Sequence, residues 1–256
     1  MTLAAAAAGF EVATRSRIIV GASATGASHM RRGTPCQDAL CVLERGPSFA
    51  IAVADGLGSA ARSDLGASIA TAAAASKALR LADDDPTQAA LAAVAAARDA
   101  LELCAGIGAI PLRDLGCTLM VAAGGEYGIG IAHICDGAVV GRAGDVWAVL
   151  SPPGASEYLN ETDPLTGDGW ERCVRWMSVI EDVDAIALFT DGCQHAALRF
   201  DGSAHRAHDG FFRPLFRFAS SGVDADDAAM RLHGLLAGRK LGEHSDDDKT
   251  LVLAVL

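Results

Sequence analysis

Two strongly apolar segments of this chain end in the same dipeptide, an aspartate followed by a glycine. Residues 49–54 lead into Asp55-Gly56, and residues 185–190 lead into Asp191-Gly192. One Asp-Gly step after a strand is most simply a turn. Two such steps after strands this apolar favour a different interpretation, in which each carboxylate lies at the rim of a rigid sheet. Several strands can direct oxygen atoms at one point there.

Further aspartates stand beside predicted strands. The run Asp246-Asp247-Asp248 leads into the apolar segment 250–256, and Asp38 precedes the predicted strand 39–43. An acidic run is normally a solvated tail, and Asp38 alone could be a turn residue. Three adjacent carboxylates at the start of a buried strand, however, repel one another unless cations compensate their charge. The pattern therefore predicts a site for divalent cations.

Such a site has a characteristic chemistry. Mg²⁺ and Mn²⁺ bind carboxylate, carbonyl and water oxygens, and Mg²⁺ retains several waters. A few aspartates can hold two ions with a water molecule between them. The ions acidify this water to a hydroxide nucleophile and neutralise the charge of the phosphoryl oxygens. Phosphate hydrolysis by this route needs no serine, cysteine or histidine nucleophile.

The order of predicted elements indicates the fold class. Short apolar runs separated by Gly and Asp turns predict a meander of antiparallel strands, and alanine-rich stretches predict helices. Helices grouped between blocks of strands favour an α+β sandwich over a βαβ arrangement. The predicted strands are 17–23, 39–43, 49–54, 117–123, 127–135, 139–143, 146–150, 174–180, 184–190 and 250–256, and the predicted helices are 63–82, 86–104 and 224–236.

Composition excludes several classes of partner. The formal net charge of −11 argues against a nucleic-acid or anionic-membrane surface. The seven cysteines include no C-x-x-C pair, which favours reduced thiols and a cytoplasmic location. No segment approaches the length of a membrane span. We expect residues 1–16 to be a disordered leader and residues 17–256 to form one domain.

The ordered set of motifs resembles the type 2C, metal-dependent serine/threonine protein phosphatases, and is closest to a bacterial branch with Gln-Asp-Ala in the opening motif. The resemblance runs from about residue 21 to residue 256. The motifs are Gly33-Thr34-Pro35-Cys36-Gln37-Asp38-Ala39, Val53-Ala54-Asp55-Gly56-Leu57-Gly58-Ser59-Ala60, Gly116-Cys117-Thr118, Gly144-Asp145, Phe189-Thr190-Asp191-Gly192 and Asp247-Asp248-Lys249-Thr250.

The resemblance implies a four-layer α-β-β-α sandwich of two antiparallel sheets, with two Mn²⁺ or Mg²⁺ ions at one edge. By position, Asp55 would bridge both ions and the Gly56 carbonyl would bind one. Asp191 and Asp247 would complete the first ion's ligands, Asp38 would serve the second, and Asp145 would support a weaker third. A variable flap near residues 151–172 would lie beside the site. The implied substrate is a phosphorylated protein, with a cognate serine/threonine kinase or its target as partner, and the implied state is a monomer.

Three departures from the family's pattern bear on activity. Gln37 replaces the usual acidic residue before Asp38, and Leu57 stands where many animal members have a histidine. Gly33 stands at the usual place of a phosphate-binding arginine, so Arg31 or Arg32 would take that role. These changes motivate an alternative, a catalytically impaired member that acts as a phosphoprotein-binding regulatory module.

A cysteine phosphatase is a further alternative, because Cys193 and Arg199 fit C-x₅-R. That mechanism needs a loop of backbone N–H groups around the phosphate, usually helped by glycine. The five intervening residues contain no glycine and look helical, so we expect the match to be fortuitous. His195 is interpreted as a surface histidine.

Overall fold

Two five-stranded antiparallel sheets form the centre of the protein. The computed structural model describes residues 17–154, 164–179 and 183–256. One sheet has the order β1-β12-β9-β6-β7 and the other β2-β3-β4-β5-β8. The strands of the first are β1 (Ile18–Ala24), β12 (Lys249–Val255), β9 (Ala185–Phe189), β6 (Ala138–Ala143) and β7 (Val146–Ser151); those of the second are β2 (Ala39–Arg45), β3 (Ser48–Ala54), β4 (Leu119–Gly125), β5 (Gly128–Ile134) and β8 (Arg175–Val179).

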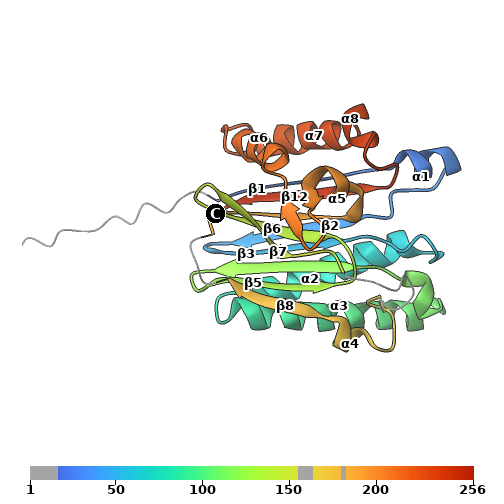
Figure 1. The fold of residues 1–256 in the computed structure, drawn as a ribbon. Coiled ribbons are helices and arrows are strands. Elements are labelled where there is room, and N and C mark those ends of the chain that lie inside the picture. The colour runs from blue at the N-terminus through green and yellow to red at the C-terminus, as the bar shows by residue number, and fades with distance from the viewer. Residues whose placement is uncertain (1–16, 155–163, 180–182) are drawn as a thin grey trace, which may run out of the picture.

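Helices cover the outer face of each sheet, which confirms the predicted α-β-β-α sandwich (Figure 1). The helices α2 (Ser63–Leu81) and α3 (Pro86–Gly108) pack on the β2–β8 sheet, and α6 (Asp209–Ala219) and α7 (Ala225–Leu236) pack on the β1–β7 sheet. The shorter elements are α1 (Ala27–Arg32), η1 (Leu112–Leu115), α4 (Trp170–Cys173), α5 (Asp191–Ala197), α8 (Arg239–Gly242), β10 (Leu198–Phe200) and β11 (His205–Ala207).

The layers are held together by two kinds of apolar packing. Buried alanines line the contact of α2 and α3 with their sheet, so these backbones approach closely. Between the sheets, larger side chains such as Ile51, Ile186 and Val252 are fully buried. Burial of one such side chain contributes about 1.5–3 kcal/mol. The two sheets therefore form a rigid base for the loops at their ends.

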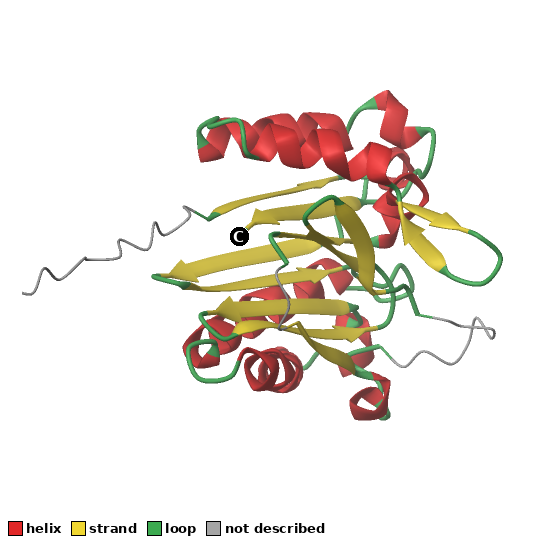
Figure 2. Ribbon diagram, turned by 60° about the vertical axis from the view of Figure 1, so that its left-hand side comes forward, coloured by secondary structure: helices red, strands yellow, loops and turns green. Residues whose placement is uncertain are grey.

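The sequence predicted the long strands and α2, α3 and α7, but not the short helices. As expected, Pro86 lies at the start of α3, where the Asp85 carboxylate accepts hydrogen bonds from the N–H groups of Thr87 and Gln88. The helix α6 was missed because Pro214 lies inside it. Figure 2 shows the layers from another side, with the short β10–β11 hairpin at the margin of the sandwich.

Two expectations fall wholly or partly outside the described residues. The predicted leader 1–16 lies outside them, as does the segment 155–163 of the predicted flap. At the flap's far end, Leu165 is fully buried and its N–H donates to the Cys117 carbonyl (3.1 Å). No helix among the described residues is long and apolar enough to cross a membrane.

Candidate metal centre

Strand register brings the predicted aspartates to one edge of the sandwich. Ala39 of β2 pairs with Ala54 of β3, so Asp38 and Asp55 leave the sheet side by side. In the other sheet, Leu251 of β12 pairs with Phe189 of β9, which brings Asp191 close to the acidic run before β12. This edge is the one at which α1 lies, and the chain ends at the opposite side (Figure 1).

Asp38 is the most deeply buried of the predicted ligands. The Thr190 hydroxyl donates to its Oδ2 (2.8 Å), whereas its Oδ1 is buried and has no hydrogen-bond partner among the described residues. Burial raises the pKa of Asp38, and the negative charges of Asp248 and Asp191 raise it further, although hydrogen bonds from Thr190 and Thr250 act in the opposite direction. An unpartnered buried carboxylate oxygen is unusual in a folded protein, and a cation or a water that it orients would satisfy it.

The Asp55-Gly56 step is fixed by its backbone. The Asp55 N–H donates to the Thr118 hydroxyl and the Thr118 N–H donates to the Asp55 carbonyl, each at 2.8 Å. Burial, followed by the charges of Asp38, Asp191 and Asp247, raises the pKa of Asp55. A Cβ on Gly56 would lie 2.8 Å from the carbonyl oxygen of Gln37, so this position requires glycine. The Asp55 carboxylate is thereby held among three others.

Asp191 begins α5 and faces two further aspartates. Burial, then the charges of Asp247 and Asp136, raise the pKa of Asp191 to about 6. A Cβ on Gly192 would collide with the carbonyl oxygen of Asp248, so glycine allows α5 to approach the acidic run. The Asp247 side chain is half exposed. This side of the cluster is therefore more open to solvent than the side at Asp38.

The structure does not bring Asp145 to the cluster. Asp145 lies in the β6–β7 turn with its side chain 96% exposed, 3.6 Å from the Arg213 guanidinium. The aspartate near Asp191 is Asp136, which follows β5 and which the sequence analysis passed over. Asp145 is therefore not placed to contribute to this cluster, whereas Asp136 lies on its Asp191 side, since Ala138 of β6 pairs with Phe189 of β9. Asp136-Gly137 is a third Asp-Gly step after an apolar strand, the same signal that identified Asp55 and Asp191.

Asp248 organises the loops around the site. Its side chain is 2% exposed, and its oxygens accept hydrogen bonds from the Gly26 N–H (2.7 Å), the Gln37 N–H (2.6 Å) and His29 Nδ1 (2.6 Å). Gly26 and His29 belong to the segment that contains α1, and Gln37 directly precedes Asp38. Asp248 therefore positions the Asp38 backbone, whereas its neighbour Asp247 faces the cluster. The resemblance named Asp247 as a ligand and gave no role to Asp248.

Of the two predicted phosphate-binding arginines, Arg31 is the better placed. Both side chains are exposed, but the Arg31 guanidinium donates to Asp246 (2.7 Å), immediately before Asp247. Arg32 donates to the Ser28 carbonyl of its own helix (3.3 Å). His195 is exposed on α5 and lies close enough to Asp191 to lower its pKa slightly.

The cysteine-phosphatase alternative finds no support in the geometry. Cys193 is fully buried in α5, where its thiol donates to the Thr250 carbonyl (3.8 Å), and burial raises its pKa far above the ordinary value. Arg199 donates instead to the carbonyls of His195 and Leu198. A buried thiol with a raised pKa is a poor nucleophile.

The donors suit hydrated, oxygen-binding ions. Among the described residues, no three Asp, Glu, His or Cys side chains converge as a complete ligand set for one ion. Mg²⁺ keeps several waters and commonly takes only one or two carboxylates, whereas structural Zn²⁺ needs a closed set of four ligands. Spaced aspartates with an unpartnered buried oxygen therefore fit ions of the Mg²⁺ and Mn²⁺ type.

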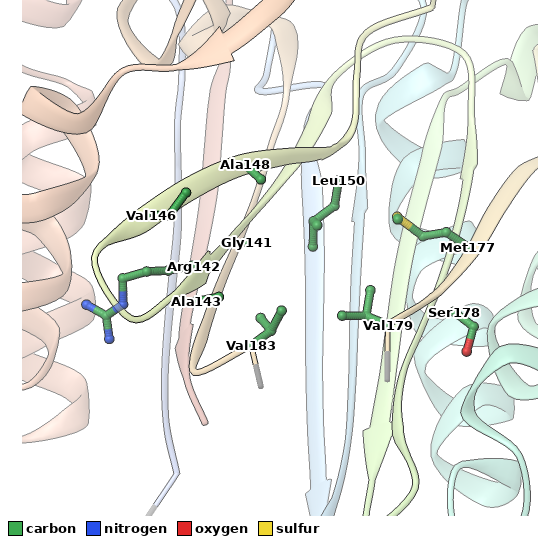
Figure 3. A pocket seen from close by; sticks show the side chains of 10 residues that line it. All are labelled: Gly141, Arg142, Ala143, Val146, Ala148, Leu150, Met177, Ser178, Val179 and Val183. Carbon is green, nitrogen blue, oxygen red and sulfur yellow. The ribbon is translucent and has the colours of Figure 1, made fainter. Parts of the chain in front are cut away.

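A separate cavity of about 540 Å³ lies between the β6–β7 hairpin and β8 (Figure 3). Leu150, Met177, Val179 and Val183 project into it, and its described lining includes no carboxylate. It is therefore distinct from the aspartate cluster.

Comparison with known proteins identifies the family and supports the fold. The sequence pattern of the family described as "Protein phosphatase 2C" matches residues 25–237. Serine/threonine-protein phosphatase 3 of Escherichia coli (strain K12) is 31% identical over 254 residues, which cover 93% of this chain and 97% of that protein. The serine/threonine phosphatase PstP/Ppp of Mycobacterium tuberculosis has a similar fold, with a TM-score of 0.61 at 18% identity over 94% of this chain and 98% of that one. Serine/threonine phosphatase Stp1 from Staphylococcus aureus also has a TM-score of 0.61, at 13% identity over 93% and 94% of the two chains.

Proposed function

Since this chain belongs to the protein phosphatase 2C family, we propose that it hydrolyses phosphoserine and phosphothreonine in proteins with the aid of divalent cations at the aspartate edge of its sheets. The chain is a metal-dependent serine/threonine protein phosphatase by its family and by its 31% identity to a phosphatase of that class. The alternative of a regulatory module without activity is not favoured, because every predicted aspartate except Asp145 lies at or beside that edge.

The proposed ligands are Asp38, Asp55, Asp191 and Asp247, with the Gly56 carbonyl, for two Mn²⁺ or Mg²⁺ ions. Asp136 is the proposed ligand of a weaker third ion. The bound ions would stabilise the negative charge on the transferring phosphoryl group and activate a water molecule. What supports this assignment is the buried Oδ1 of Asp38, which lies in a cluster of like charges and has no hydrogen-bond partner in the part of the chain that the structure describes.

The chain's own residues would orient these ligands. Thr190 fixes one oxygen of Asp38 and leaves the other available. Thr118 holds the Asp55 backbone from both sides. Arg31, exposed beside the acidic run, is proposed to attract the substrate phosphate, because a guanidinium binds phosphate oxygens in a bidentate manner.

The substrate is proposed to be a phosphorylated protein, with the cognate serine/threonine kinase or a target of that kinase as partner. We also propose a reducing, cytoplasmic environment, because the spacing of the seven cysteines includes no C-x-x-C pair. A monomeric state stays a prediction.

The test is phosphate release from a phosphothreonine peptide with and without Mn²⁺. Asp55→Asn barely changes the side chain's size, so we expect a cooperative thermal melt and at least a hundredfold loss of Mn²⁺-dependent turnover, on the order of the effect of removing a main electrostatic group. Asp145→Asn is the matched control and should keep wild-type activity. Full activity in the Asp55→Asn protein would refute the proposed centre.

A further inference from the structure

Arg175, the first residue of β8, connects three segments that are far apart in the sequence. Its Nη1 donates to the Pro152 carbonyl (2.5 Å), just after β7 ends. Its Nη2 donates to the Cys135 carbonyl (2.8 Å) and lies 3.1 Å from Nδ1 of His133. One guanidinium therefore contacts the end of β7 and the turn that carries Asp136.

His133 contacts the same turn from the buried side of β5. Its side chain is fully buried. Its Nε2 lies 2.8 Å from the Asp136 carbonyl, which can only accept, so Nε2 carries the proton. Its Nδ1 is then an acceptor, which matches the Ser151 hydroxyl at 2.8 Å, while Arg175 Nη2 lies near both ring nitrogens, 3.1 Å from Nδ1 and 3.3 Å from Nε2. His133 and Arg175 thus bind the carbonyls of two consecutive residues, Asp136 and Cys135.

The turn that they hold has an unusual backbone. Cys135 has φ +68°, in the left-handed region that favours glycine, and Gly137 follows with φ +92°. A non-glycine residue keeps such a conformation only where its surroundings impose it. The Asp136 Oδ1 accepts from the Gly137 N–H (2.8 Å), so the carboxylate direction depends on this backbone. The turn also lies beside the strand that leads into Asp191, because Ala138 of β6 pairs with Phe189 of β9 and a Cβ on Gly137 would lie 2.9 Å from the Phe189 carbonyl oxygen.

We propose that Arg175 is a positioning residue that sets divalent-cation affinity at the Asp136–Asp191 side of the centre, by holding the Cys135–Asp136 turn against the end of β7. The inference rests on the proposed function, since it assumes that Asp136 binds a cation. Residues that orient metal ligands change metal affinity roughly 10- to 100-fold when they are replaced.

The test is calorimetric titration of the metal-free protein with Mn²⁺ alone, which needs no turnover. We expect Arg175→Gln to weaken the lowest-affinity Mn²⁺ step about tenfold. Asp136→Asn should weaken the same step, and the double variant should be no weaker than Asp136→Asn, because Arg175 acts through Asp136. Arg217→Gln, which removes an exposed arginine on α6, should bind Mn²⁺ like the wild type.

Three outcomes separate the possible roles. Unchanged Mn²⁺ affinity in a folded Arg175→Gln protein, or an equal loss in the presence and absence of Asp136, would overturn the proposal in favour of a purely structural role. If Arg175→Gln does not fold, Arg175→Lys decides the same comparison, because lysine keeps the charge but not the two-sided contact. If the wild type binds no Mn²⁺ at all, the proposed function itself fails, and this inference fails with it.

Discussion

Replacing the proposed ligand Asp191 with asparagine should stabilise the metal-free protein. Asp191 has a pKa raised to about 6 from its ordinary value of 3.8, because burial and the charges of Asp247 and Asp136 disfavour its ionised form. A carboxyl group that binds protons more tightly in the folded than in the unfolded state lowers stability as the pH rises between the two pKa values. The metal-free protein should therefore lose stability at this residue from about pH 4 to about pH 6.

The size of this change in unfolding free energy follows from the two pKa values of Asp191. A rise in pKa from 3.8 to about 6, at 1.36 kcal/mol per pKa unit, corresponds to about 3 kcal/mol of unfolding free energy. Asp191→Asn removes the charge and preserves the shape of the protonated acid. The variant should match the wild type near pH 4 and exceed its metal-free stability by up to about 3 kcal/mol above pH 7.

The assay is urea denaturation at several pH values, with EDTA in one series and saturating Mn²⁺ in the other. With saturating Mn²⁺ the wild type should become more stable than Asp191→Asn, because an ion that binds only the folded wild type stabilises it by mass action. Asp83→Asn is a control of opposite sign: Asp83 is exposed, and hydrogen bonds from Ser48 and Arg45 lower its pKa. That variant should lose stability at neutral pH, and this loss should fade as the pH falls through the pKa of Asp83.

Two results in the comparison of Asp191→Asn with the wild type would refute this reasoning. If Asp191→Asn is less stable than the wild type above pH 7 in EDTA, the aspartates do not repel one another as the structure indicates. If Mn²⁺ does not restore the wild type's advantage, Asp191 is not a ligand.

Two further predictions concern neighbouring side chains. Asp248→Ala should lower the unfolding free energy in urea by about 3–5 kcal/mol, because it leaves two buried donors and one partly buried donor without their acceptor, and Asp248→Asn should cost less. An alanine variant as stable as the wild type would contradict the role assigned to Asp248. Cys193→Ser should retain phosphatase activity while EDTA abolishes it, since the thiol is buried and bonded to the Thr250 carbonyl; loss of activity that EDTA does not affect would favour a cysteine mechanism instead.

The sequence predicted those site residues that follow a strand-and-turn pattern. Asp55 and Asp191 were predicted as ligands because each follows a long apolar run, which forms β3 and β9 in the structure. Asp136 shares this pattern but was not predicted as a ligand, because the Gly-Asp motif of the family was matched to Gly144-Asp145. The residue before Asp136 is Cys135, whose left-handed conformation cannot be read from its side chain.

Contacts between residues far apart in the sequence could not be predicted from local sequence patterns. Gly26 and Asp248 are separated by 222 positions, and only the pairing of β1 with β12 brings them together. The helix α6 was missed for a local reason, although Phe212, Leu215 and Phe216 recur at helical spacing on its buried face. The interior Pro214 and the Asp-Gly pair at its start obscured that signal.

The aspartates lie at strand ends, where their mutual repulsion lowers the stability of the metal-free protein but does not prevent folding. Four carboxylates at one edge oppose folding, yet their backbones belong to or adjoin strands whose hydrogen bonds and apolar faces lie elsewhere in the sandwich. The sheets can therefore hold the aspartates in place without relying on favourable contacts among the carboxylates. Asp38 illustrates this arrangement, since Thr190, which follows β9 of the other sheet, donates to one of its oxygens, and the other has no partner among the described residues. A cation that satisfies this oxygen would lower the repulsion in the cluster, so the stability of this edge and its catalytic function depend on the same ions.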